Sequence, residues 1–148
     1  MTITALDPIK GRGSQLAQFP LGEDKSLGVD HLLICDLSPD GSRLALAHSP
    51  AGPIEVHSLR GQKMLTISTA GFAPLRHIAW AADGKGLFVS THKQDTGELL
   101  HLDMHGKANV IWKCAGPNWC MANPSPDGRR IAIFETKRNA NVFMMENF

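Results

Sequence analysis

The chain has 148 residues, of which 43% are hydrophobic and 20% are charged, a composition typical of one soluble globular domain. Its 15 basic and 14 acidic side chains nearly cancel, and no run of Lys or Arg resembles a phosphate-binding stripe, so nucleic acid is not an expected partner. No apolar stretch approaches about 20 residues and the first residues do not resemble a signal peptide, so we expect no membrane partner and favour a cytoplasmic location.

Residues 1–30 have the pattern of an incomplete unit followed by a linker. Two alternating runs, residues 2–6 and 15–19, are typical of β-strands, and a turn with two glycines separates them. Residues 21–30 contain two glycines and four charges and connect this pair of strands to the next unit.

A four-residue turn recurs through the rest of the chain. Ser38-Pro39-Asp40-Gly41 returns as Ser125-Pro126-Asp127-Gly128 and, in altered form, as Ala81-Ala82-Asp83-Gly84. Proline fixes φ for a type I turn and glycine accepts the left-handed backbone after it, so the motif predicts a tight hairpin. The turn aspartates lie 43 and 44 residues apart, a spacing typical of propeller blades. We therefore interpret six residues as structural turn residues, although loop aspartates can also ligate calcium: Asp40, Gly41, Asp83, Gly84, Asp127 and Gly128.

Alternating apolar runs flank each turn and predict β-strands. The first full unit carries four, at residues 32–37, 43–48, 53–59 and 63–68. The second carries four, at 76–80, 86–91, 97–103 and 108–113, and the third carries three, at 119–122, 130–135 and 141–146. The predicted organisation is one domain, with an incomplete blade and linker over 1–30, then blades over 31–72, 73–115 and 116–148, the last without its fourth strand.

The residues around these turns resemble the TolB-like propeller repeat, also called the WD40-like PD40 repeat. The resembling pattern is Ser-Pro-Asp-Gly, a basic or polar residue, Leu or Ile, Ala, and an aliphatic or aromatic residue, over residues 38–46, 83–89 and 125–134. Residues 142–148 also resemble the carboxyl terminus of bacterial proteins in which such repeats follow a kinase or a winged-helix DNA-binding domain. The resemblance implies an all-β fold, a partial β-propeller of about three four-stranded antiparallel blades.

Three blades are too few to close a ring, because propellers usually have about 4 to 8 and each sheet needs a neighbour on both faces. We therefore expect a homodimer of half-propellers with six blades, in which the amino-terminal strands of one chain complete the third blade of the other. The alternative is that the chain is a fragment of a longer propeller.

The sequence contains no recognisable catalytic arrangement: no Gly-x-Ser-x-Gly elbow, no phosphate-binding glycine-rich loop, and no evident histidine partner for Cys120. We expect a non-catalytic module for protein interaction or sensing, without a cofactor. One alternative is a structural fragment of a larger propeller protein. Another is a small-ligand, metal or enzymatic site at the channel of an assembled propeller, built from Asp36, His77 and Asn123. These polar groups could instead bond nearby turn backbone.

The cysteines and histidines do not predict a disulfide framework or a metal site. Cys35, Cys114 and Cys120 form no Cys-x-x-Cys pair and are expected to be buried free thiols. His101 and His105 have the spacing of helical metal ligands, but a strand end would separate them by over about 13 Å. The large aromatic residues are expected to wedge between the blades: Trp80, Phe88, Trp112, Trp119 and Phe134.

Overall fold

The computed structural model of this chain describes residues 2–6, 9–11, 13–18, 34–60, 62–72, 74–93, 96–114 and 120–135. Every regular element in these residues is a β-strand, which confirms the predicted all-β class. The part of the chain that the structure describes contains no helix long and apolar enough to cross a membrane.

Eight strands form two four-stranded antiparallel sheets, and in each sheet the strands pair in chain order. Sheet I consists of β3 (Ile34–Leu37), β4 (Arg43–Ala47), β5 (Ile54–Ser58) and β6 (Lys63–Ile67). Sheet II consists of β7 (Leu75–Trp80), β8 (Gly86–Lys93), β9 (Thr96–Asp103) and β10 (Ala108–Cys114). The prediction of four-stranded antiparallel units is thus confirmed for the two central repeats.

Two hairpins flank these sheets in the sequence. The first pairs β1 (Thr2–Leu6) with β2 (Gly13–Gln18), and the second pairs β11 (Cys120–Pro124) with β12 (Ile131–Glu135). The strand predicted at residues 141–146 lies outside the described residues, as does Trp119.

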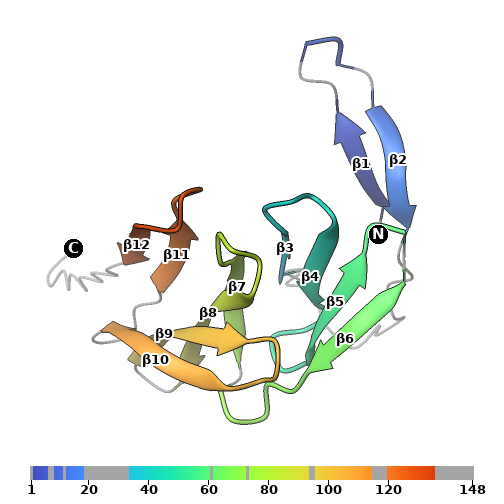
Figure 1. Ribbon diagram of the computed structural model, residues 1–148. Coiled ribbons are helices and arrows are strands. Elements are labelled where there is room, and N and C mark those ends of the chain that lie inside the picture. The colour runs from blue at the N-terminus through green and yellow to red at the C-terminus, as the bar shows by residue number, and fades with distance from the viewer. Residues whose placement is uncertain are drawn as a thin grey trace, which may run out of the picture.

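The two sheets and the β11–β12 hairpin lie next to one another in an open arc (Figure 1). Their first strands, β3, β7 and β11, are neighbours, with β7 in contact with both of the others. The last strands, β6 and β10, lie on the outer side of the arc, and the β1–β2 hairpin stands apart from both sheets (Figure 1). Among the described strands, none packs against the face of sheet I that bears Leu37 or against the face of the hairpin that bears Phe134. Leu44 and Leu46, on that face of sheet I, are nevertheless buried, with 4% and 0% of their surface exposed.

Alternation of side chains along the strands gives each sheet two faces, and the arc buries the facing ones. The larger apolar cluster joins sheets I and II and includes Ala45, Val56, Ile78, Trp80, Leu87, Val89 and Leu102. The smaller cluster joins sheet II to the β11–β12 hairpin and consists of Ala79, Ala81, Phe88, Leu99, Cys114, Cys120 and Ala122.

The expected aromatic wedges are found at two of the four positions that are described. Trp80 and Phe88 are buried between sheets, with 2% and 9% of their surface exposed. Trp112 and Phe134 are 48% and 63% exposed, so the expectation is wrong for these two in the single chain. Trp112 lies on the outermost strand of sheet II, and Phe134 alternates onto the uncovered face of β12.

Candidate functional site

The three turn motifs have one backbone geometry. Gly41, Gly84 and Gly128 all have φ between 66° and 68°, a left-handed conformation that favours glycine. Each glycine amide donates to the carbonyl oxygen three residues earlier, that of Ser38, Ala81 or Ser125, at 2.8 to 2.9 Å. The altered middle motif therefore forms the same turn without serine or proline.

The turn carboxylates are held by the turns themselves. Asp40 Oδ1 accepts from the Ser38 hydroxyl at 2.6 Å and from the Ser42 amide at 3.1 Å. These hydrogen bonds, that from Ser38 first, lower the pKa of Asp40 to about 2. The Ser125 hydroxyl, 2.5 Å from Asp127 Oδ1, likewise lowers the pKa of Asp127. Both carboxylates are therefore charged near neutral pH.

The turn aspartates also define equivalent positions in the three repeats. Four residues before them stand Asp36, Ala79 and Asn123, and three residues before them stand Leu37, Trp80 and Pro124. Three residues after them stand Arg43, Gly86 and Arg130.

Two groups of polar contacts, one from Asp36 and one from Arg43, join sheet I to sheet II. Asp36 Oδ2 accepts from the Trp80 amide at 2.7 Å, and the Asp36 carbonyl oxygen accepts from Trp80 Nε1 at 3.0 Å. The Arg43 guanidinium lies over the Trp80 ring, 4.5 Å from its centroid, and its Nη2 donates to the Gly84 carbonyl oxygen at 2.9 Å. We call these two groups of contacts the Asp36 clamp and the Arg43 clamp.

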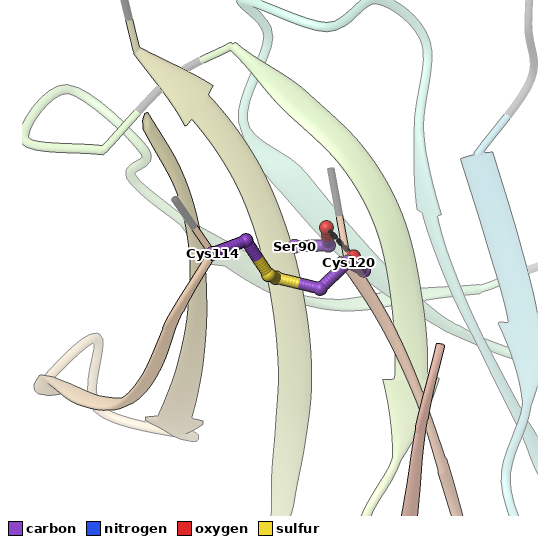
Figure 2. The surroundings of a disulfide bond; sticks show 3 residues. All are labelled: Ser90, Cys114 and Cys120. Atoms are coloured by element: carbon purple, nitrogen blue, oxygen red, sulfur yellow. Dashed lines mark hydrogen bonds between the residues drawn. A yellow bond between two sulfur atoms is a disulfide. The ribbon is translucent and has the colours of Figure 1, made fainter. Parts of the chain in front are cut away.

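The interface between sheet II and the β11–β12 hairpin has neither clamp, because Ala79 and Gly86 occupy the equivalent positions. A disulfide joins Cys114, the last residue of β10, to Cys120, the first of β11, and the Ser90 hydroxyl donates to the Cys120 carbonyl oxygen (Figure 2). The expectation of three buried free thiols is therefore wrong. Cys35 is free but exposed, and the other two cysteines are buried and bonded to each other. Their pairing depends on the return of the chain from an outer to an inner strand, which spacing alone does not reveal.

The three residues predicted to line a channel do not form one site. Asp36 is engaged by Trp80, and His77 is half-buried on β7. Burial lowers the pKa of His77, and the Asp36 charge partly opposes this. Asn123 is exposed on β11, and no hydrogen bond between described residues joins it to Asp36 or His77. The charge of Asp36 thus acts on His77, whereas Asn123 lies on the exposed face of the hairpin.

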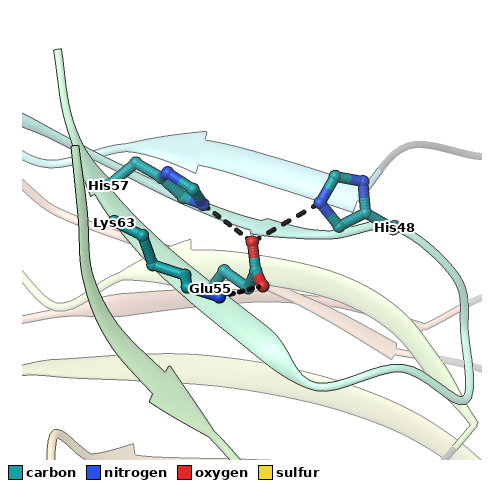
Figure 3. A network of polar contacts seen from close by, with 4 residues as sticks. All are labelled: His48, Glu55, His57 and Lys63. Atoms are coloured by element: carbon teal, nitrogen blue, oxygen red, sulfur yellow. Dashed lines mark hydrogen bonds and ion pairs between the residues drawn. The ribbon is translucent and has the colours of Figure 1, made fainter. Parts of the chain in front are cut away.

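A polar cluster on sheet I was not anticipated from the sequence. Glu55 Oε2 lies 2.8 Å from His57 Nε2 and 3.5 Å from His48 Nε2, and Lys63 Nζ lies 3.2 Å from Oε1 (Figure 3). Burial raises the pKa of Glu55, but the bonds from His57 and Lys63 outweigh it and the pKa is lowered. The Glu-x-His alternation places both side chains on one face, but only strand pairing brings His48 and Lys63 to them.

Among the described residues, no group of three or more His, Cys, Asp or Glu side chains is arranged to hold a metal ion. No protein-family model matches the chain, and a comparison with curated proteins found no significant match. Its function is therefore inferred from the contacts between the sheets.

Proposed function

We propose that this chain is a non-catalytic β-propeller module of the TolB-like type, serving protein interaction or sensing, and that two copies complete one six-bladed ring. The blades are the units at residues 31–72, 73–115 and 116–148, which contain sheet I, sheet II and the β11–β12 hairpin. Residues 1–30 supply strands to a blade of the second copy.

The observation that carries this proposal is the reappearance of both clamp positions on an uncovered face. Asn123 stands where sheet I has Asp36, and Arg130 stands where it has Arg43. Both residues are exposed. Side chains alternate between the two faces of the hairpin, so Asn123 and Arg130 lie on the face opposite Cys120 and Ala122, which are buried against sheet II. The hairpin therefore presents a side-chain oxygen and a guanidinium at the two positions that join sheet I to sheet II.

The face of sheet I that bears Leu37 would supply the groups that these two residues meet. Leu37 occupies the position equivalent to Trp80 and is 44% exposed. Gly41 occupies the position equivalent to Gly84, whose carbonyl oxygen accepts from Arg43. In a second copy, the Gly41 carbonyl oxygen would thus meet Arg130, and Asn123 would lie beside Leu37, whose amide already donates to Asp36 Oδ1 at 2.9 Å in its own chain. A twofold axis forms both such contacts at once, which closes the ring.

The strands at the two ends of the chain complement one another. The β1–β2 hairpin pairs with no other described strand, and an isolated two-stranded hairpin is marginally stable in water. The β11–β12 sheet has two described strands where sheets I and II have four. Apolar Phe134 is 63% exposed on β12 and would be covered by a neighbouring sheet in the ring.

Light scattering behind size exclusion tests the ring. We expect a mass of twice 16.1 kDa that persists on dilution. The double variant Asn123→Ala, Arg130→Ala should shift the mass toward 16.1 kDa, whereas the matched control Arg60→Ala, at an exposed arginine between β5 and β6, should not. A monomeric mass at every concentration would contradict ring closure by a second copy. A dimeric mass that the double variant does not change would contradict an interface through Asn123 and Arg130.

The alternative of an enzymatic site at Asp36, His77 and Asn123 is less well supported, because Asp36 already accepts a hydrogen bond from the buried Trp80. Hydrolysis of generic ester or phosphoester substrates, lost in a His77→Gln variant that still folds, would contradict the non-catalytic proposal. We expect no such activity.

A further inference from the structure

A cleft of about 450 Å³ opens between sheet II and the β11–β12 hairpin. The two turn motifs contribute Asp83 and Asp127, sheet II contributes Phe88 and His101, and Pro124 at the end of β11 forms part of the wall. This volume is within the range of small-ligand sites, about 300 to 1,000 Å³.

In the interface between sheets I and II, side chains fill the space that corresponds to this cleft. Between sheets I and II, the Arg43 guanidinium covers Trp80 and donates to the carbonyl oxygen of Gly84. In the next repeat the equivalent residues are Gly86, Pro124 and Gly128. The cleft therefore coincides with the loss of a guanidinium and an indole from an otherwise repeated turn, and it retains the glycine whose carbonyl oxygen accepts in the first interface.

The cleft wall carries groups suited to a planar cation. The amides of Lys85 and Arg129 and the hydroxyl of Ser125 all bond to Oδ1 of the turn aspartates, and no described residue donates a hydrogen bond to Oδ2 of Asp83 or Asp127. Both of these second oxygens are available to a ligand.

Aromatic rings form another part of the wall. The rings of Phe88 and His101 lie 5.4 Å apart at 60° to each other, and both line the cleft. His101 stands where the first interface has Val56, and its Nε2 would lie 2.6 Å from a Cβ added to Gly86. The imidazole thus occupies part of the space over Gly86 and replaces an aliphatic surface with an aromatic one.

We propose that this cleft binds the guanidinium of an arginine side chain of a partner protein, in place of the internal arginine that the first interface has. Guanidinium is the cation of choice because it stacks on ring faces and donates in a fixed fork to carboxylate and carbonyl oxygens. The lysine ammonium is compact and strongly hydrated, so it would pair with the carboxylates but lacks the planar group that stacks on the aromatic rings. That the arginine belongs to a partner protein rests on the proposed role in protein interaction. The cleft itself lies within one chain, so arginine binding does not require the six-bladed ring.

The test is an NMR titration of the isotope-labelled full chain with Nα-acetyl-arginine methylamide. Saturable shifts should appear at the amides of the Asp83 and Asp127 turns, with a dissociation constant on the order of 1 mM for so small a ligand. The citrulline analogue, a neutral isostere, should give no saturable shift. The substitutions Asp83→Asn and Asp127→Asn keep Oδ1 for the turn, and each should weaken binding by roughly two- to fivefold.

A variant that refills the cleft provides a second readout. Gly86→Arg combined with His101→Val restores the arginine and the valine of the first interface while Pro124 stays in place of Trp80, and the internal guanidinium should abolish binding of the arginine derivative. No saturable shift with the arginine derivative, an equal response to citrulline, or unchanged affinity in the Asp83→Asn, Asp127→Asn double variant would overturn the proposal. Because the solution mass is measured on the same samples, failure of the cleft and failure of the ring are distinguishable.

Discussion

The guanidinium of Arg43 lies over the ring of Trp80, 4.5 Å from its centroid, and so joins a strand of sheet I to a strand of sheet II. Trp80 is 2% exposed, so the contact is desolvated on the ring side. It covers the edge of the apolar cluster between the sheets and fixes their relative position at the end that bears the turns.

Replacement of Arg43 should loosen this interface. We expect Arg43→Ala to lower the free energy of unfolding by about 1 to 3 kcal/mol, the sum of a partly buried cation–π contact and one hydrogen bond. Arg43→Lys should recover only part, because lysine lacks the planar fork. Urea denaturation measures the effect, with Arg60→Ala as the exposed control. Equal stability of the Arg43→Ala and control proteins would contradict this role.

Removal of the Asp36 carboxylate should also be destabilising. Asp36→Ala leaves the buried amide of Trp80 without its acceptor at 2.7 Å, which we expect to lower the free energy of unfolding by about 1 to 3 kcal/mol. Asp36→Asn keeps an oxygen at the same place and should retain most of the stability. If both substitutions were equally harmful in chemical denaturation, the negative charge and not the hydrogen bond would be the important feature.

The titration of His77 should report its burial and its neighbour. Its pKa is lowered by burial, against the opposing charge of Asp36, so Asp36→Asn should lower it further. The unfolded chain binds this proton more readily than the folded chain, so the contribution of His77 to stability is complete above about pH 6.5 and declines as the pH falls from there toward the folded pKa. NMR titration of the His77 ring measures the shift, and a rise in pKa in Asp36→Asn would be the opposite of the expected result.

Reduction of the Cys114–Cys120 disulfide should release the β11–β12 hairpin from sheet II. Chain-entropy reasoning gives a loss of roughly 2 kcal/mol for so short a loop. Hydrogen exchange should accelerate in β11 and β12 before it does in sheet I. The substitution Cys35→Ser, at the exposed free thiol, is the control and should leave the exchange pattern unchanged. Uniform acceleration over all strands after reduction would show that the bond stabilises the whole chain instead.

Local features of the sequence determined the strands and turns. The Asp-Gly motifs specify a left-handed glycine, and alternating apolar residues specify which side of each strand is buried, so the two four-stranded antiparallel sheets and the 43- and 44-residue repeat could be predicted. The positions of Asp36, Arg43 and their counterparts were also visible in the repeat, but not the groups that they would meet.

Only the tertiary structure decided which residues touch across the sheets. Contacts such as Asp36 to Trp80 span 44 residues, and the Cys114–Cys120 bond depends on the chain returning from an outer to an inner strand. The cleft beside Phe88 arises because Gly86 and Pro124 lack the side chains that fill the same space one interface earlier. Periodicity along the sequence fixes the direction in which a side chain points, whereas the packing of one sheet on the next fixes what it meets there.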